Sequence, residues 1–471
     1  ENVLEELFDL SAERVEQLYY GMLGGSPCME NLSLDALRQG LHRCGLPNLE
    51  IATLERMMAI VNQGQASATL GLAEFEAILS RLKLAQLLSG VCRLPLDKET
   101  LGGRRIVLGG SVVRPSAREA SELLTVIDYS SQTAQTMRVP KAKHREFFFG
   151  HRKRLKGTDL PLVRWVHMSG LDLTLLLALT VKYGLHPLSI EDVIEQCPTK
   201  IDRYGCNYFA AVEQLCLVGD PDTRGSGASP VRVAGFHVAA FCSGPPLFDT
   251  VITMAQPDRS FASDWPGGAA SEAATSRWDM KLRQRLTTAP RSRLRERRAD
   301  FILYQIIDLS TDELQAVILA YTARLGRLEN SVSGLHAQCV LGEESLDLCT
   351  EASTCRLQLK VVLRRVRGLQ RLLRHFSGDP DFTADLSGYL QDVAEHLDEA
   401  YEDAAQLVDK CTAIIESQHR AVDRRDEKVH QRTADRLNKT LFVLTVGTFV
   451  FAPMQFLAAV YGMNFVNEDG V

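Results

Sequence analysis

The clearest hydrophobic pattern of the chain is a long apolar run near its C-terminal end. Residues 440–461 carry no ionisable side chain except Tyr461. A helix rises about 1.5 Å per residue, so a run of this length can cross a hydrocarbon core of about 30 Å. The pattern predicts a transmembrane helix over 440–461 and makes the lipid bilayer an expected partner. We expect it to be the first of two spans, with the second missing from this chain, and a short loop to follow over 462–471.

A heptad pattern leads into this run. Its two seams consist of apolar residues seven positions apart, Leu386, Val393, Ala400, Leu407 and Ile414 in one and Leu390, Leu397, Ala404 and Cys411 in the other. Such a repeat is typical of helix-on-helix packing. From 416 to 439 the seams become polar, with no helix breaker before Pro453. We predict a very long stalk helix over 383–439, which either feeds a pore or holds a domain off the bilayer as a coiled coil.

The middle of the chain changes from mixed to purely helical periodicity. Residues 278–377 show helical patterns only and predict a long hairpin, with helices over 293–332 and 344–376. Residues 100–277 predict a mixed α/β domain with helices at 171–183 and 189–196. Its expected strands are 104–108, 123–129, 162–168, 208–218, 231–241 and 247–254.

Residues 1–90 have a four-helix pattern that looks like two EF-hands. Ser33 is an expected helix cap. A calcium loop needs several carboxylates at alternate positions and a bidentate glutamate, and only Glu74 could serve here. We therefore expect degenerate loops that bind no Ca²⁺, in a module that packs against the chain or binds an unknown partner. The overall fold class is α+β.

Composition excludes several classes of function. The formal charge is -6, which gives no reason to expect a nucleic-acid partner. The 11 cysteines are scattered without zinc-ligand spacing, so we interpret them as reduced thiols. We find no nucleophile–base pair, phosphate loop or metal triad, and we expect that the chain is not an enzyme.

Except for Leu441, one face of the predicted span is small or carries hydroxyl and amide groups. Steps of three or four residues connect the members of this face, Asn438, Leu441, Thr445, Thr448, Ala452, Gln455 and Ala459. Small residues let helices approach closely, and the polar groups can face water or a neighbouring helix. The face predicts a pore lining, with packing in a bundle that has no pore as the alternative.

The residues after this face suit a hydrated magnesium ion. Mg²⁺ prefers oxygen ligands and gives up its water reluctantly. Asn464, with the backbone carbonyls of Gly462 and Met463, could contact that water as a selectivity filter. One chain supplies too few oxygens, so a pore requires an oligomer. Glu468 and Asp469 follow and could concentrate cations at the mouth.

These motifs resemble those of the CorA family of magnesium channels. Tyr461-Gly462-Met463-Asn464 is similar to the signature that ends the family's first membrane helix. Further similar segments extend the resemblance over about residues 100–464, namely 163–166, 183–193, 200–204, 300–308 and 389–393. The chain departs from the family at Ala452, where a bulky apolar gate is usual, and at Gln455, where a threonine is usual.

The resemblance implies a homopentamer with a funnel made of the α/β domains. It also implies that Mg²⁺ is both transported and regulatory, binding between subunits at Asp192 and Asp403 with Glu191. Loss of this Mg²⁺ would leave like charges facing each other and favour opening. Glu427 falls near the position where the family narrows its pore with an acidic side chain.

Two rival functions remain open. The same fold could move zinc or another divalent ion, or the chain could be a membrane-tethered sensor or scaffold that does not conduct. Arg432, Arg436 and Lys439 flank the predicted span, which places the large domain on the cytosolic or organellar-matrix side. The sequence does not identify the membrane.

Overall fold

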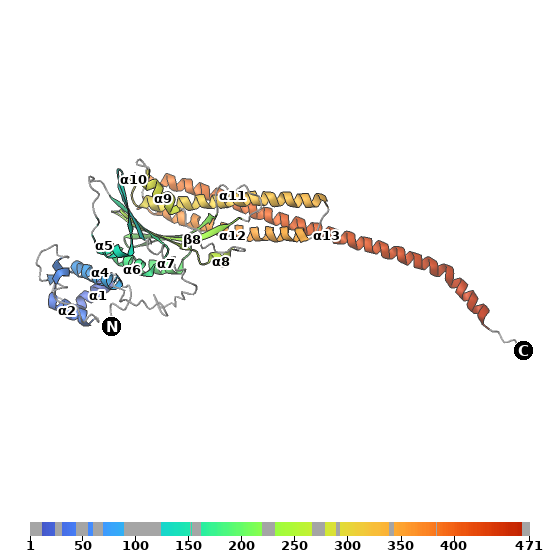
Figure 1. Ribbon diagram of the computed structural model, residues 1–471, viewed down its shortest axis with the longest axis horizontal. Helices are drawn as coiled ribbons and strands as arrows, with labels where there is room; N and C mark the ends of the chain where they lie inside the picture. Colours follow the sequence, from blue (N-terminus) through green and yellow to red (C-terminus); the bar gives the residue numbers. More distant parts are fainter. Residues whose placement is uncertain are drawn as a thin grey trace, which may run out of the picture. The chain divides into compact units, whose positions relative to one another are not determined.

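The computed structural model describes residues 12–23, 31–43, 55–59, 69–88, 124–150, 152, 162–218, 231–265, 278–288, 293–338, 343–382 and 384–463 (Figure 1). The chain divides into two compact units. The larger unit comprises 1–321 with 358–405, and the smaller unit comprises 322–357 with 406–471.

The N-terminal part of the larger unit is helical, as predicted. Its elements are α1 (Ala12–Met22), β1 (Leu32–Ser33), α2 (Leu34–Arg43), a short helix at 55–59, β2 (Thr69–Leu70) and α4 (Leu72–Leu88). β1 pairs with β2 in antiparallel fashion. The Ser33 hydroxyl oxygen accepts a hydrogen bond from the Ala36 amide at 3.2 Å, which confirms the expected cap.

Glu74 has a structural role at the start of α4. Its Oε2 accepts a hydrogen bond from the Gly71 amide at 2.7 Å, as in a capping box. The sole carboxylate considered for a calcium loop is thus engaged in starting a helix. Most of the two loops lies outside the described residues, so EF-hand character and the lack of Ca²⁺ binding stay predictions.

A seven-stranded sheet forms the α/β part, in the order β4-β3-β5-β9-β8-β7-β6. Its strands are β3 (Leu124–Tyr129), β4 (Ala134–Val139), β5 (Val163–Ser169), β6 (Lys200–Tyr204), β7 (Asn207–Leu217), β8 (Val233–Ser243) and β9 (Thr250–Pro257). β5 and β9 run parallel, and the other neighbouring pairs run antiparallel.

The sequence analysis missed two of these strands. Both β4 and β6 lie at edges of the sheet, and the middle of β4 is exposed on both faces. An edge strand with so little burial needs no apolar alternation, so hydrophobic period does not reveal it. The strand expected at 104–108 lies outside the described residues.

Helices cover both faces of the sheet. α6 (Leu173–Tyr183) and α7 (Pro187–Glu195) pack on one face, and Leu84 and Leu87 of α4 join the same core. The other face meets α9 (Trp278–Thr287) (Figure 1). There the ring of Trp278 lies 6.2 Å from that of Trp165. Three short helices complete this part: η2 (Lys141–Lys143), α5 (His144–Phe149) and α8 (Phe261–Asp264).

Local sequence signals set the bounds of α6. The Asp172 carboxylate accepts a hydrogen bond from the Leu175 amide at 3.0 Å and caps the start of the helix. Gly184 ends the helix in the left-handed region, at φ 60.

Replacing Gly184 with alanine should lower the free energy of unfolding by about 1 kcal/mol, because a Cβ is disfavoured at positive φ. Gly388 is a matched control in the same unit, since it is an exposed glycine within a helix and a Cβ there would meet nothing within 4 Å. Gly388→Ala should raise the same quantity by about 0.5–1 kcal/mol. Thermal unfolding followed by circular dichroism measures both, and shifts of the same sign would contradict the argument.

Four helices complete the chain: α10 (Arg293–Glu296), α11 (Asp300–Gln338), α12 (Glu343–Gly378) and α13 (Ala384–Gly462). The prediction of one helix beginning at 293 was wrong. The Ala299 amide donates a hydrogen bond to the Phe248 carbonyl at 2.9 Å, and this tertiary bond interrupts the helix before α11.

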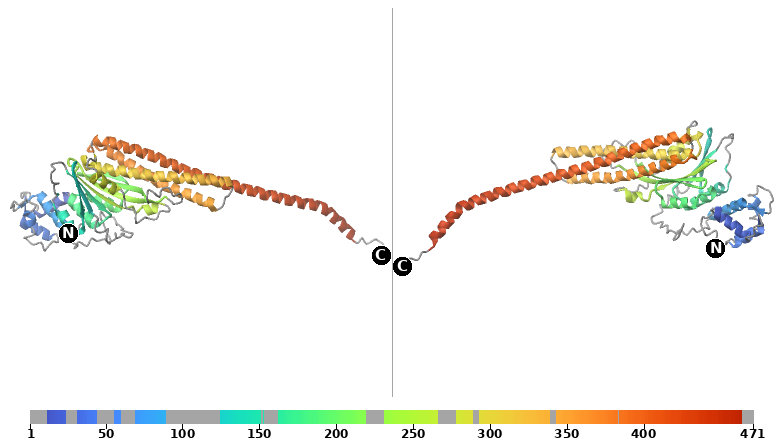
Figure 2. Two further views of the ribbon diagram at one scale, coloured as in Figure 1. Left: turned by 45° about the horizontal axis from the view of Figure 1, so that its top comes forward. Right: turned by 180° about the vertical axis from the view of Figure 1, so that it is seen from behind.

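The heptad prediction agrees with the burial of α13. All nine seam residues from Leu386 to Ile414 are buried, those up to 405 in the larger unit and the rest in the smaller unit. From 422 to 446 every side chain of α13 is exposed. The predicted stalk and span thus form one helix, which Figure 2 shows as an uninterrupted ribbon.

Candidate ion pathway and regulatory carboxylates

The apolar C-terminal part of α13 has no packing within the described chain. Its most apolar 18-residue window has a mean hydropathy of 1.9, and none of that window is buried. A core helix of equal hydropathy would be mostly buried. This exposed apolar surface therefore suits a membrane, other copies of the chain, or both.

The predicted pore face runs along this exposed part of the helix. At about 100° per residue, its members share a sector of about 100°. Each of them is exposed: Asn438, Leu441, Thr445, Thr448, Ala452, Gln455 and Ala459. The structure keeps these residues on one side of α13 but gives them no partner chain, so their role as pore lining stays a prediction.

Two threonines of this face are fixed by the helix itself. The Thr445 hydroxyl donates to the Leu441 carbonyl at 2.7 Å, and the Thr448 hydroxyl donates to the Leu444 carbonyl at 2.9 Å. With its proton committed to the backbone, each hydroxyl oxygen presents only acceptor lone pairs to its surroundings. The water around a cation points its hydrogens outward, so such a face suits a hydrated cation better than an anion.

Pro453 lies inside α13 and cannot donate to the Phe449 carbonyl. The C-terminal part of the helix bends in both views of Figure 2. A proline within a helix is a usual cause of such a bend. The Phe449 carbonyl therefore lacks the hydrogen bond that the residue four positions later would otherwise donate.

The predicted filter begins where α13 ends. Gly462 is the last helical residue, and the Met463 amide donates to the Val460 carbonyl at 3.3 Å. A Cβ at Gly462 would meet nothing within 4 Å, so this chain alone gives no steric reason for glycine. Asn464, Glu468 and Asp469 lie outside the described residues, and their roles stay predictions.

Acidic residues continue the pore face toward the stalk. Glu427 lies eleven residues, about three turns, before Asn438 and is exposed on the same side of α13. Asp423, one turn further, shares this side and is also exposed. The sequence analysis did not include Asp423, although the same step of four residues leads from Glu427 to it.

The predicted regulatory residue Asp192 already has a cationic partner. Its Oδ2 lies 2.8 Å from the Lys200 Nζ, which is also 2.9 Å from Asp202. Burial alone would lower the pKa of Lys200, but its hydrogen bonds to the two carboxylates outweigh burial and raise that pKa above its ordinary value. Lys200 therefore stays charged and competes with any metal ion at Asp192.

The other two regulatory candidates lie on different elements. Glu191 is partly exposed on α7, next to Asp192, whereas Asp403 is exposed on α13. No group of three His, Cys, Asp or Glu side chains that could hold a metal ion occurs among the described residues. One copy of the chain thus does not bring Glu191, Asp192 and Asp403 together as a complete site.

A buried ion cluster joins α12 to the sheet. The Arg365 side chain has no exposed area and contacts the carboxylates of Glu213 on β7 and Asp258 beyond β9, the latter at 2.6 Å. Burial lowers the pKa of Arg365 to about 10, so it stays charged at neutral pH. The sequence analysis missed this cluster because its members are far apart in the chain.

Comparison with known proteins supports a transport family. The family model described as CorA-like Mg2+ transporter protein matches residues 271–467. The cobalt/magnesium transport protein CorA of Thermotoga maritima is 22% identical over 174 residues, which cover 36% of this chain and 44% of that protein. The divalent cation transporter CmaX of Pseudomonas aeruginosa is 26% identical over 143 residues, covering 29% of this chain and 41% of that protein. The matches thus span less than half the length of these two relatives.

Two solved structures are also similar. The full-length CmaX protein has a TM-score of 0.42 at 15% identity and covers 74% of this chain and 90% of its own. The ZntB cytoplasmic domain from Vibrio parahaemolyticus has a TM-score of 0.40 at 10% identity and covers 64% of this chain and 99% of its own. Residues 271–467, which include the stalk, the apolar helix and the Gly462-Met463-Asn464 segment, thus match the CorA-like family model, and parts of the chain are similar to divalent-cation transport proteins.

Proposed function

We propose that the chain is one subunit of an oligomeric divalent-cation channel, with α13 lining the ion path. The observation that carries this proposal is the composition of one face of α13 from Glu427 to Ala459, which is acidic before the apolar segment and, except for Leu441, small or hydroxyl/amide-bearing within it. This face suits hydrated Mg²⁺ best, because the hydroxyl and amide oxygens of the face accept hydrogen bonds from the water bound to the ion. A ring of such faces needs several copies, and the family resemblance favours five.

Selection and gating are proposed at the two ends of the path. Backbone carbonyls of Gly462 and Met463 with the Asn464 amide would contact the hydrated ion, while Glu468 and Asp469 attract it. On the stalk side, Mg²⁺ shared by Asp192 or Glu191 of one copy and Asp403 of the next would hold neighbouring copies together. We place this part on the cytosolic or matrix side, as Arg432, Arg436 and Lys439 indicate.

Ion uptake by liposomes that carry the full-length protein tests this proposal. Uptake of Mg²⁺ that is lost in Asn464→Ala supports the channel and its filter. Uptake of Zn²⁺ without Mg²⁺ would support a zinc transporter of the same fold. No flux of either ion, with the protein correctly inserted, would overturn the channel and leave a tethered scaffold as the better account.

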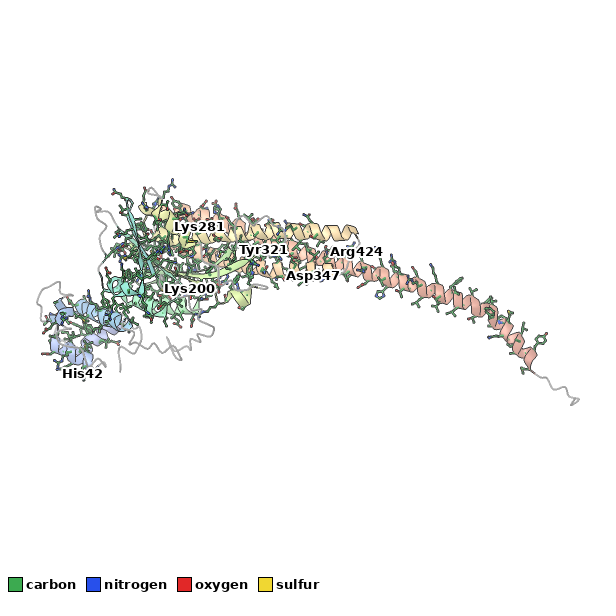
Figure 3. All side chains as sticks on the ribbon, in the orientation of Figure 1. His42, Lys200, Lys281, Tyr321, Asp347 and Arg424 are labelled. Atoms are coloured by element: carbon green, nitrogen blue, oxygen red, sulfur yellow. The ribbon has the colours of Figure 1, made fainter. Side chains whose placement is uncertain are left out.

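The ion pair at Asp192 gives a sharper prediction for gating. Lys200→Met removes the ammonium group that competes for this carboxylate, so the Mg²⁺ concentration that closes the channel should fall about two- to fivefold, as expected for a partly exposed pair. Lys281→Met is the matched control, because Lys281 forms a similar ion pair with Glu313 at 2.7 Å. Lys281 lies on α9, whereas Lys200 lies on β6 (Figure 3). Flux against internal Mg²⁺ concentration measures both, and equal shifts in the two variants would contradict a role for Asp192.

A further inference from the structure

Four basic side chains form a row on α13 just before the apolar segment. Lys428, Arg432 and Arg436 are four residues apart, and Lys439 follows three residues later. At about 100° per residue these positions fall within a sector of about 80°. All four side chains are exposed. We call these four residues the basic row.

The basic row lies opposite the ion path. On a regular helix its centre is about 170–190° from the centre of the pore face, so the two faces point in opposite directions. The acids Asp423 and Glu427 lie on the pore side, whereas Asp435 lies at the edge of the basic row, which keeps a net positive charge. If α13 lines a central path, the basic row faces outward.

The basic row is a local excess of positive charge without an acidic partner among the described residues. Between 428 and 439 the chain has four bases and only Asp435 as an acid, although the whole chain is acidic. The ion pair that joins Arg420 to Glu416 on α13 involves none of the four. An exposed cationic row of this kind attracts an anionic surface.

We propose that the basic row binds the anionic phospholipid headgroups of the leaflet that α13 enters. The inference rests on the proposed membrane position of the apolar segment. Measured along the helix from Leu441, the four residues lie about 3 Å (Lys439), 8 Å (Arg436), 14 Å (Arg432) and 20 Å (Lys428) before the apolar segment. Headgroup attraction decays within a Debye length of about 8 Å at physiological salt, so Lys439 and Arg436 carry most of it.

A lipid surface fits the basic row better than a soluble polyanion. The row lies on the convex surface of a single helix, without surrounding donors that could enclose a free phosphate group. A headgroup layer presents many anionic groups side by side, and the apolar segment holds the helix next to that layer. Each lysine or arginine near such a surface improves binding about fivefold, and salt weakens the effect.

The test uses the full chain in phosphatidylcholine vesicles. It measures how strongly spin-labelled phosphatidylglycerol associates with the protein relative to spin-labelled phosphatidylcholine, and this ratio is the lipid preference. The double variant Arg436→Gln/Lys439→Gln should lose at least about fivefold of the wild-type preference for phosphatidylglycerol. The control Arg420→Gln/Arg424→Gln removes the same charge from the same helix about 25–30 Å from the apolar segment and should retain that preference (Figure 3 labels Arg424).

Three results would overturn the inference. The first is an equal loss of lipid preference in both double variants, and the second is no preference in the wild type. The third is a preference that millimolar inorganic phosphate abolishes at constant ionic strength, which would indicate that the row binds a soluble anion. Vesicle flotation is measured on the same samples. If the chain floats but shows no lipid preference, only the proposed headgroup binding is overturned. If the chain does not float, the proposed membrane position is overturned as well.

Discussion

Replacing Arg365 with alanine should lower the melting temperature of the chain by about 10 °C. The substitution leaves the carboxylates of Glu213 and Asp258 without their shared cation, and the exposed fractions of these two side chains are only 20% and 4%. Breaking a buried pair in this way costs about 3–5 kcal/mol, because the remaining charges are desolvated and uncompensated. In a unit of this size each kcal/mol shifts the melting temperature by about 2–4 °C.

The neighbouring residue provides the control for this prediction. Arg364 contacts Asp264, but its side chain is 55% exposed. Arg364→Ala should therefore change stability by less than about 1 kcal/mol. Thermal unfolding of both variants, followed by tryptophan fluorescence in the same detergent, gives the comparison. Equal shifts would mean that the Arg365 cluster contributes no more than a surface ion pair.

Removing the two pore-face hydroxyls should reduce Mg²⁺ flux at least about tenfold. Thr445→Val/Thr448→Val preserves side-chain shape but deletes two acceptors for the water around the ion. Each lost acceptor costs about 1–3 kcal/mol if the ion's water then has no partner. Flux into liposomes, normalised to inserted protein, measures the effect.

Thr440→Val is the control for this loss. The Thr440 hydroxyl donates to the Arg436 carbonyl at 2.9 Å, in the same manner as Thr445 and Thr448, but it lies about 100° away from the centre of the pore face. Flux through this variant should stay near the wild-type value. A similar loss in both variants would indicate a general effect on helix α13 and not an ion path along one face.

Elements in which buried apolar residues recur at a regular spacing or form a continuous run could be predicted from sequence. The seam of α13 has a period of seven, and buried strands such as β8 stand out by their apolar runs. β4 and β6 were missed because these edge strands bury too few residues to show an apolar alternation. The break before α11 was missed because it depends on a bond from Ala299 to Phe248, which the local pattern does not contain.

The candidate site was predictable where it follows one helix. The pore face comes from the helical period and Glu427 from the family resemblance; both lie on one side of α13, and their roles stay predictions. The partner of Asp192 was not foreseen, because Lys200 reaches it only once β6 joins the sheet beside α7. The Arg365 cluster likewise requires the packing of α12 on the sheet.

Water and ions should meet only one face of α13, and modification of an introduced thiol tests this expectation. None of the 11 cysteines lies beyond Cys411, so a cysteine placed in the apolar segment is the only thiol there. Thr448→Cys and Val450→Cys place it on nearly opposite sides of the helix. A charged, water-soluble thiol reagent should block Mg²⁺ flux through Thr448→Cys and leave Val450→Cys and the wild type unaffected. Equal block of both variants, or no block of Thr448→Cys despite its labelling, would contradict the claim.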